Sequence, residues 1–303
     1  MKRTKSALGG VAVAVALLAT ACGGGDPTSD DTGGDAPSDT IVVGSANFPE
    51  NALLANIYAE ALRAKGVKVE TQLNIGSREA YIPGLEDGSI DLIPEYSGVL
   101  LQFYDAEATE VSSDEVYAAL PDALPSDLIV LDKSSAEDKD AIVVTQDVAS
   151  QYNLESIEDL APVAGDLTMG GPPEFKTRPD GLPGLKDNYG VEFGSYKSLD
   201  AGGPLTVNAL KNGQIDAGDL FTTDPSIPDN DFVVLADPKS NFAAQNVLPL
   251  INKEKATDTV TSTLNAVSAK LDTQTLTDLL TRVYAKEDPN AVAKDWLASV
   301  GLD

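Results

Sequence analysis

Histidine is absent from this sequence of 303 residues, and cysteine occurs once, as Cys22. Without histidine, the chain has no Ser/His/Asp triad and no Cys/His pair for nucleophilic catalysis. It also lacks the ligands of a zinc site built on Cys and His, and a single thiol closes no internal disulfide. The functions that remain are binding, or catalysis by carboxylates, lysine, tyrosine or a hard metal ion.

Positive charge is also scarce. Lysine and arginine number 21 against 48 aspartate and glutamate residues, which gives a net charge of −27 and a pI of about 4.1. Nucleic-acid binding requires a basic surface that displaces counterions from phosphates, so we expect no nucleic-acid partner. The acidic residues show no DxDxDG spacing of a calcium-binding loop, and we expect neither a metal nor a cofactor.

The first residues have the pattern of an export signal. Lys2, Arg3 and Lys5 precede an apolar run, Ala7–Ala19, that is too short to span a bilayer comfortably. We therefore predict a signal peptide over residues 1–21 and an extracytoplasmic location for the mature protein.

The residues before Cys22 resemble the lipobox of bacterial lipoproteins. Most lipoboxes carry leucine three places before the cysteine; here that place is Ala19, and Leu18 stands one place earlier. We expect the thiol of Cys22 to be acylated and to anchor the mature chain to the cell membrane. The alternative is an ordinary secretory signal with a chance cysteine. Residues 22–39 are rich in Gly, Asp, Ser, Thr and Pro and predict a flexible linker, because they have too little apolar surface to fold.

From Thr40 onward, short apolar runs alternate with helical patterns such as Pro49–Ala64, whose apolar residues have the spacing of one helical face. This alternation is typical of α/β layers with largely parallel sheets, in which ligands bind beyond the carboxyl ends of the strands. The tail, Ala256–Val300, predicts three helices. The strand candidates are Ile41–Ser45, Val67–Leu73, Ile90–Ile93, Leu128–Leu131, Ala141–Thr145, Leu167–Met169, Ile215–Leu220, Phe232–Leu235 and Val247–Ile251.

Two segments about half the chain apart resemble each other. LEDGSIDLIPEYS (Leu85–Ser97) and LKNGQIDAGDLFT (Leu210–Thr222) share Leu, Gly, Ile and Asp, and Tyr96 or Phe221 stands eight places after the glycine. Each segment predicts a helix that ends at a left-handed glycine, a short buried strand, and an aromatic residue at its carboxyl end. The repeat suggests two similar lobes whose aromatic residues reach one cleft from opposite sides. The alternative is a common helix and strand pattern with two core aromatics.

Five motifs follow one another along the chain: GSANFPE (Gly44–Glu50), IGSREAYIPGLEDGSIDLIPEYSG (Ile75–Gly98), PEFKTRPDGLPGLKDNYG (Pro173–Gly190), LFTTDPSI (Leu220–Ile227) and VVLADPKSNF (Val233–Phe242). In this order and at this spacing, they resemble the extracytoplasmic substrate-binding proteins of ABC importers for quaternary ammonium osmoprotectants such as glycine betaine, choline and carnitine. The resemblance covers nearly all of the chain from Ile41 onward. It implies a two-lobed α/β fold like that of type II periplasmic binding proteins, with a ligand cleft between lobes that close by hinge motion.

The resemblance also implies domains and partners. Lobe 1 is expected to comprise residues 40–144 plus 246–303, and lobe 2 residues 145–245. The expected partners are a small-molecule ligand, an ABC permease with its ATPase, and the membrane through the lipid anchor. The protein is expected to capture a small zwitterionic or cationic osmoprotectant and deliver it to the permease without catalysing a reaction.

The implied ligand site combines an aromatic cage with an arginine. A trimethylammonium group has no N–H donor and is held by aromatic faces, while an arginine binds the carboxylate end. By resemblance, Tyr96 is a cage tyrosine and Arg178 is the carboxylate-binding arginine, unless Tyr96 packs in the core or Arg178 forms a salt bridge. Asp140, Phe221 and Gln245 stand where relatives have cage tyrosines.

These three departures predict a pocket that is more polar or more open. Either the ligand brings a donor or a cation to Asp140, or this side chain points to solvent or lies beside Lys139. Ser77 and Thr222 lie at a helix start and in a loop that are expected to face the cleft, where they can donate hydrogen bonds to the ligand.

Several alternatives remain open for the ligand and for the function. With a depleted cage, glycine betaine is expected to bind weakly, and the natural ligand is a different osmoprotectant or another polar small molecule. Otherwise neighbouring aromatic residues such as Tyr81, Tyr104 or Phe242 rebuild the cage. The competing functional classes are a surface lipoprotein that binds another protein and an extracytoplasmic enzyme that uses carboxylates.

Overall fold

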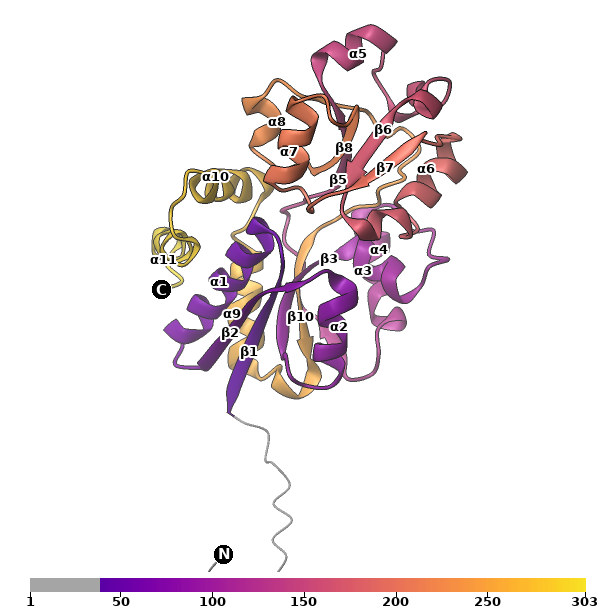
Figure 1. The fold of residues 1–303 in the computed structure, drawn as a ribbon. Coiled ribbons are helices and arrows are strands. Elements are labelled where there is room, and N and C mark those ends of the chain that lie inside the picture. Colours follow the sequence, from indigo (N-terminus) through magenta and orange to yellow (C-terminus); the bar gives the residue numbers. More distant parts are fainter. Residues whose placement is uncertain (1–38) are drawn as a thin grey trace, which may run out of the picture. The chain divides into compact units, whose positions relative to one another are not determined.

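The structure, a computed structural model, describes residues 39–303. The signal peptide over residues 1–21, the acylation of Cys22 and all but the last residue of the linker therefore lie outside the described residues. Residues 39–303 form two mixed sheets of five strands, each covered by helices on both faces (Figure 1). We call the first sheet with its helices lobe 1 and the second sheet with its helices lobe 2.

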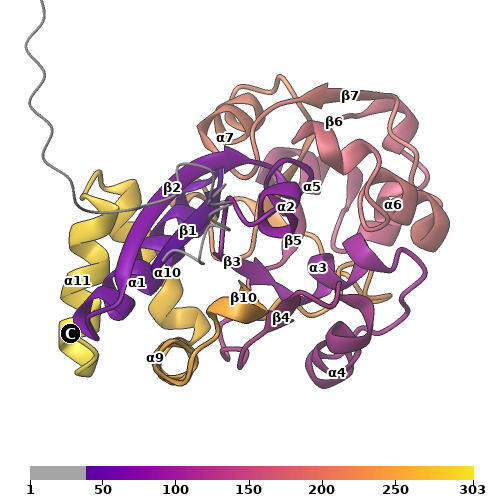
Figure 2. The same ribbon diagram turned by 90° about the horizontal axis from the view of Figure 1, so that it is seen from below.

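The sheet of lobe 1 takes its strands from both ends of the described chain. Its order is β2-β1-β3-β10-β4, and the faces are covered by α2, α3 and α4 on one side and by α1, α9, α10 and α11 on the other (Figure 2). The strands are β1 (Thr40–Ala46), β2 (Lys68–Gly76), β3 (Leu92–Tyr96), β4 (Leu128–Val130) and β10 (Val247–Asn252). The helices are α1 (Pro49–Ala64), α2 (Arg78–Glu86), α3 (Ser97–Tyr104), α4 (Ser113–Ala123), η4 (Lys253–Lys255), α9 (Asp258–Ser268), α10 (Thr273–Tyr284) and α11 (Pro289–Val300).

The sheet of lobe 2 has the order β7-β6-β8-β5-β9. Helices α5 and α6 with three 3₁₀ turns pack on one face, and α7 and α8 pack on the other. The strands are β5 (Asp140–Val144), β6 (Thr168–Gly171), β7 (Ser195–Ser198), β8 (Ala217–Phe221) and β9 (Val233–Val234). The helices and turns are α5 (Gln146–Tyr152), η1 (Ile157–Leu160), η2 (Ala164–Asp166), η3 (Pro173–Lys176), α6 (Leu182–Tyr189), α7 (Pro204–Lys211) and α8 (Ser226–Asp229).

The chain crosses between the lobes twice, at residues 131–139 and 235–246, and each crossing leads into an antiparallel strand. β5 begins with Asp140 opposite Phe221, where β8 ends, and β10 begins with Val247 opposite Tyr96, where β3 ends. A strand that arrives from the other lobe begins at the facing edge of the sheet, so it runs against the strands that end there. The prediction of largely parallel sheets is therefore wrong, because four of the eight strand pairs are antiparallel.

The position of β5 also corrects the expected boundary of lobe 1. Residues 40–144 include β5, but this strand pairs with β8 and β9 in the sheet of lobe 2. The first crossing therefore precedes Asp140.

The repeat found in the sequence forms equivalent elements in the two lobes. Helices α2 and α7 are each followed by a glycine with positive φ, +78° at Gly88 and +62° at Gly213. Glycine adopts this left-handed conformation without steric cost, and it turns the chain out of the helix toward β3 or β8. Because both strands end at an aromatic residue opposite a crossing strand, Tyr96 and Phe221 occupy corresponding positions at the facing edges of the sheets.

Helix α1 holds the ends of two strands of lobe 1 together. Pro49 occupies the first helical position, where its missing N–H is not needed, and Phe48 is the N-cap residue. Asn51 then links three elements, because its Oδ1 accepts a hydrogen bond from the N–H of Ala46 (2.7 Å) and its Nδ2 donates to the carbonyl of Pro94 (2.9 Å). The ends of β1, α1 and β3 are thus held in register.

The C-terminal helices contact lobe 2 as well as lobe 1. The hydroxyl of Tyr284, the last residue of α10, lies 3.3 Å from the carbonyl oxygen of Gly202 and 3.1 Å from a carboxylate oxygen of Asp224. Both residues belong to lobe 2. The packing of α10 against α1 and this contact therefore bring the tail of the chain to both lobes.

We expect Gly181→Ala to destabilise the protein by about 1–3 kcal/mol, the usual cost of overpacking. A Cβ at Gly181 would overlap the backbone carbonyl of Phe175, so the segment that carries Arg178 into α6 would have to move. Urea denaturation measures the free energy of unfolding. Gly165→Ala is the matched control, because no other atom lies within 4 Å of a Cβ there. Equal stabilities of the two variants would contradict this account.

Candidate functional site

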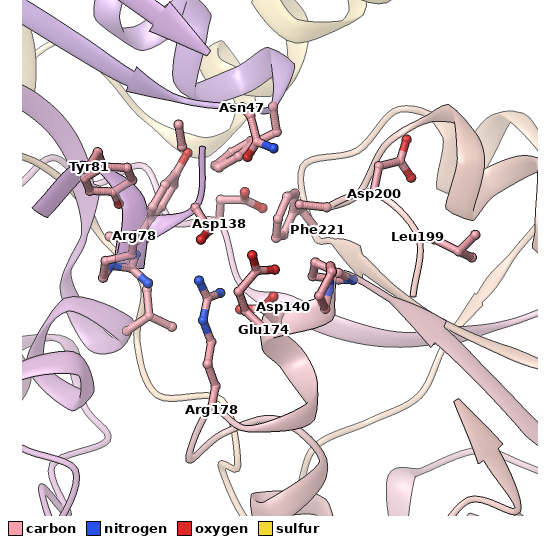
Figure 3. A pocket seen from close by; sticks show the side chains of 18 of the residues that line it. Asn47, Arg78, Tyr81, Asp138, Asp140, Glu174, Arg178, Leu199, Asp200 and Phe221 are labelled. Atoms are coloured by element: carbon pink, nitrogen blue, oxygen red, sulfur yellow. The ribbon is translucent and has the colours of Figure 1, made fainter. Parts of the chain in front are cut away.

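A cavity of about 390 Å³ lies between the lobes, within the range of roughly 300–1,000 Å³ found for small-molecule sites. Its walls follow the carboxyl ends of β1, β3, β6 and β8 and the two crossing segments, which contribute Asp138 and Gln245. Figure 3 shows Arg78, Arg178 and Phe221 around this cavity. Open α/β sheets bind ligands beyond the carboxyl ends of their strands. This cavity is therefore the candidate site.

Three aromatic rings from both lobes meet in one wall. The ring centroid of Phe48 lies 5.0 Å from that of Phe221 and 6.0 Å from that of Tyr96, so Phe48 joins the two predicted rings. Phe48 is not among the predicted site residues, although it lies in the GSANFPE motif. Its place directly before Pro49, at the start of a helix that follows a strand, is the signal that points to it. The faces of these rings provide a site for a cation.

Of the other aromatic residues considered for the cage, Tyr81 lines the cavity and Tyr104 and Phe242 do not. The hydroxyl of Tyr104 lies 3.4 Å from Glu86 on α2. Phe242 is buried in the core of lobe 2, where its ring centroid lies 6.4 Å from that of Phe175. Four aromatic side chains therefore line the cavity. Tyr96 and Phe221 occupy expected cage positions, and Phe48 and Tyr81 lie outside them.

A buried ion pair supports the Tyr81 side of the cavity. Arg78 donates from Nε and Nη2 to the two carboxylate oxygens of Glu95 at 2.8 and 2.7 Å, and Tyr81 donates its hydroxyl to the same carboxylate. Burial opposes the charge of Arg78, but Glu95 outweighs this effect and raises the pKa of the guanidinium. The charge of Arg78 is therefore neutralised inside the protein.

Glu50 connects the aromatic wall to lobe 2. Its carboxylate accepts hydrogen bonds from the hydroxyl of Tyr96 (2.9 Å) and from that of Thr223, while Asp138 accepts from the N–H of Thr223 (3.0 Å). Burial raises the pKa of Glu50, and burial together with the charge of Glu50 raises the pKa of Asp138 well above its usual range. Both shifts have the same physical cause, because two negative charges buried close together are less favourable than one.

Arg178 lies in the cavity wall and is bound to a carboxylate of the other lobe. Its Nε and Nη2 each lie 3.2 Å from an oxygen of Glu79 on α2. The structure thus brings Arg178 to the cavity, as the resemblance implied, and also places it in the salt bridge that was the alternative. Burial would raise the pKa of Glu79, but the hydrogen bonds and charge of Arg178 outweigh it and lower the pKa to about 2.

Asp140 lies in the cavity wall near Arg178 and Glu174 (Figure 3). It neither points away from the cleft nor pairs with Lys139, whose Nζ lies 3.6 Å from Glu137 instead. Both local interpretations of this side chain are therefore wrong. Burial raises the pKa of Asp140, while Arg178 opposes the shift. Asp140 is the first residue of β5, and this strand follows directly on the crossing segment. Its carboxyl therefore lies at the edge of the sheet that faces the cavity.

Gln245 and Ser77 line the cavity, but Thr222 does not. Gln245 is 1% exposed, and its Oε1 accepts a hydrogen bond from the N–H of Val99 (3.0 Å), which orients its Nε2 the other way; within residues 39–303, this amide nitrogen has no partner. Thr222 follows Phe221 and therefore points to the opposite side of the chain, where its hydroxyl accepts from the N–H of Lys139 (2.9 Å).

The arrangement fits a small cation or zwitterion. Aromatic faces and carboxyl groups suit a positive charge, and Arg178 suits a carboxylate. In the part of the chain that the structure describes, no three His, Cys, Asp or Glu side chains are placed to hold a metal ion. Over the same residues, no helix combines the length and the apolar character needed to cross a membrane.

Comparison with known proteins gives a consistent result. Residues 39–299 match the family described as the substrate binding domain of the ABC-type glycine betaine transport system. The chain is 29% identical to a glycine-betaine-binding protein of Pseudomonas aeruginosa over 281 residues, 87% of this chain and 89% of that one. It is 26% identical to the carnitine transport binding protein OpuCC of Listeria monocytogenes over 272 residues, 87% of this chain and 88% of that one.

The fold is also found among solved structures. A glycine betaine/carnitine/choline ABC transporter structure superposes with a TM-score of 0.68 at 23% identity, covering 86% of this chain and 99% of the other. This similarity confirms the two-lobed fold of type II binding proteins.

The contact between Glu79 and Arg178 predicts a dependence of stability on pH. The folded pKa of Glu79 is depressed to about 2, so the pair stabilises the protein fully above the usual pKa of about 4.5 and loses this effect as the pH falls toward 2. We expect Glu79→Gln to lower the free energy of unfolding by on the order of 1 kcal/mol or less at pH 7, because the pair is partly exposed. Urea denaturation at pH 7, 5, 4 and 3 should show the difference from wild type shrinking.

Glu192→Gln is the control for this experiment. Glu192 pairs with Lys186 at 3.0 Å, but both side chains are more than half exposed, so no measurable change is expected at any pH. A difference between wild type and Glu79→Gln that stays constant from pH 7 to pH 3 would contradict the assignment.

Proposed function

The chain belongs to the family of substrate-binding domains of ABC-type glycine betaine transport systems, and on this premise we propose that it captures a small zwitterion or cation of the glycine betaine, choline and carnitine class. The ligand binds in the cavity between the lobes and is delivered to the permease, which works with its ATPase. In this role the protein catalyses no reaction.

The observation that carries this proposal is the contact of Phe48 with both Tyr96 and Phe221. One continuous aromatic wall receives rings from both lobes, so a cation placed against it contacts lobe 1 and lobe 2 together. Each cation–π contact contributes roughly 0.5–2 kcal/mol. Arg178 lies in the same cavity and supplies a guanidinium for a ligand carboxylate.

Ligand binding is coupled to the position of the lobes. Nε and Nη2 of Arg178, the two nitrogens that could bind a ligand carboxylate, donate hydrogen bonds to Glu79 of lobe 1. A carboxylate ligand that binds Arg178 takes the place of Glu79 or shares the guanidinium with it. The ligand therefore replaces or modifies a contact between the lobes, which couples its binding to the hinge motion of the lobes.

The same proposal extends to location. Secretion by the predicted signal peptide and acylation of Cys22 keep the folded lobes outside the cell, close to the permease, and residues 22–39 serve as a tether. A single acyl chain binds a membrane only reversibly, so a stable anchor requires more than one.

We expect carboxylate and cation recognition to separate in two variants. Arg178→Ala should weaken binding of glycine betaine and carnitine by about tenfold or more but leave choline, which has no carboxylate, within about threefold. Phe48→Ala should weaken all three by several-fold, because each ligand carries the quaternary ammonium group. Calorimetry measures these affinities. At a free ligand concentration of one hundred times Kd, the free energy of unfolding of wild type should rise by about 2.7 kcal/mol.

Phe103→Ala is the control for Phe48, because Phe103 is 38% exposed and lies outside the cavity. Its affinities should equal those of wild type. If none of the three compounds stabilises the wild-type protein, and no small cation or zwitterion co-purifies with it from its own host, the proposed function is wrong.

The anchor is tested by Cys22→Ala in the full-length precursor. Wild-type protein should partition into the detergent phase and carry a lipid on its N-terminal cysteine, because the acyl chains dominate its membrane affinity. The variant should lose the lipid and remain in the aqueous phase. Mass spectrometry that finds a different mature N-terminus and an unmodified Cys22 would disprove the lipoprotein assignment.

A further inference from the structure

The cavity walls are rich in carboxyl groups. Four carboxyl groups line it, those of Asp138, Asp140, Glu174 and Asp200. Asp200 caps the start of α7 by accepting backbone N–H groups, and Asp138 accepts from Thr223. Within residues 39–303, the carboxyls of Asp140 and Glu174 receive no hydrogen bond from any N–H group or hydroxyl. A ligand that enters the cavity therefore meets two unused acceptors.

The two arginines of the cavity do not neutralise these acceptors. Arg78 is paired with Glu95 at 2.7 Å, and Arg178 is paired with Glu79 at 3.2 Å. Asp140 has no Lys or Arg nitrogen within 4.0 Å among the described residues, so Arg178 influences it only over a longer distance. The acceptor beside Arg178 remains available.

A second carboxyl lies on the strand next to Asp140. Asp219 on β8 is 1% exposed, and no N–H group or hydroxyl of residues 39–303 donates to either of its oxygens. The hydroxyl of Tyr196 is close by, but it donates to the carbonyl of Pro172 (2.7 Å). In the antiparallel pair of β5 and β8, Asp140 is opposite Phe221 and Ile142 is opposite Asp219, so the side chains of Asp140 and Asp219 are diagonal neighbours on one face of the sheet.

Two carboxyl groups form a hydrogen bond only when one of them is protonated. Burial and the charge of Asp140 raise the pKa of Asp219 well above its usual range, which favours a protonated Asp219 as a donor to Asp140. A hydrogen bond of this kind orients Asp140 and leaves further lone pairs of its carboxylate for a ligand, because Asp140 lines the cavity.

The strand register places this acceptor beside an aromatic face. Asp140 is directly opposite Phe221 in the antiparallel pair of β5 and β8. Side chains that face each other in this way have Cβ atoms roughly 4.5–5.5 Å apart and lie on the same face of the sheet. A cation stacked on Phe221 therefore lies within reach of the Asp140 carboxylate.

We propose that Asp140, positioned by Asp219, accepts a hydrogen bond from the cationic group of the ligand, so that this protein prefers cations that carry an N–H donor to fully N-methylated cations. This inference rests on the proposed function and specifies its ligand class. A tertiary ammonium with one N–H donates to Asp140 while its methyl groups remain on the aromatic wall. A quaternary ammonium fills the same space but leaves a desolvated carboxylate without a donor, which is costly in a buried site.

The test uses two pairs of compounds that differ only by one N-methyl group replaced with hydrogen. These are glycine betaine with N,N-dimethylglycine, and choline with N,N-dimethylethanolamine, all of which are cationic at their nitrogen at pH 7. Calorimetry on the wild-type protein should show the N–H member of each pair binding about tenfold or more tightly, the usual strength of a charge-assisted hydrogen bond.

Variants at Asp140 assign the preference to this side chain. In Asp140→Asn, which keeps the size and removes the charge, the advantage of the N–H compounds should fall to about threefold or less. In Asp140→Tyr, which adds an aromatic face, the methylated compounds should bind more tightly than their partners. Asp187→Asn, the same change at an exposed position of α6 outside the cavity, should retain the wild-type preference.

The outcomes distinguish this inference from the proposed function. If wild type binds the probes but prefers the methylated member of each pair, or binds both equally, the inference is wrong and the proposed function stands. A preference for N–H compounds that persists in both Asp140 variants also overturns it. If none of the four probes binds to wild type, the proposed function fails and the inference fails with it. Melting temperatures verify that each variant is folded, and either Asp140 variant suffices for the assignment.

Discussion

Two antiparallel strand pairs, β10 with β3 and β5 with β8, determine where the site of this protein lies. Each crossing strand begins opposite the last residue of the strand it joins, so that the chain must leave one sheet and enter the other at their facing edges. Tyr96 and Phe221 are the residues at those ends. This pairing fixes the ends of the strands that surround the cavity. The loops that line the cavity start from these ends, so the aromatic wall and the carboxyl groups lie there as well.

Several acidic side chains of this acidic protein gather near the cavity. Glu50, Asp138, Asp140 and Asp219 lie within one network around the start of β5 and the end of β8. Full ionisation would bring several negative charges together in a poorly solvated place, so protons are retained on some of them. Hydroxyl and N–H groups of Tyr96 and Thr223 donate to Glu50 and Asp138 in this network. This makes the site selective for positively charged groups without any lysine in its walls.

The sequence predicts the α/β class, two lobes and the approach of Tyr96 and Phe221 to one cavity, because these depend on periodicity, on a repeat and on the family resemblance. It does not predict β7, whose sequence SYKS lacks apolar alternation because this edge strand is mostly exposed. The antiparallel direction of β5 is also hidden, since alternation along a strand is the same in either direction.

The site is predicted less completely than the fold. The resemblance predicts Arg178, Asp140 and Gln245 at the cleft, and the helix start predicts Ser77 there, but the partners of these side chains depend on residues distant in sequence. Glu79, for example, lies 99 positions from Arg178, and no local pattern connects the two. Thr222 shows the limit of such reasoning, because a shift of one residue along an extended chain reverses the direction of the side chain.

The contacts between the lobes differ on the two sides of the cavity. On one side, Glu50 binds Thr223 and Tyr284 reaches Asp224, and all but Tyr284 are buried. On the other side, the single ion pair of Arg178 and Glu79 is partly exposed. Separation of the two lobes requires this ion pair to break, and its exposure makes it the weaker of the two groups of contacts. The guanidinium of Arg178 is then free to bind a carboxylate that enters the cavity.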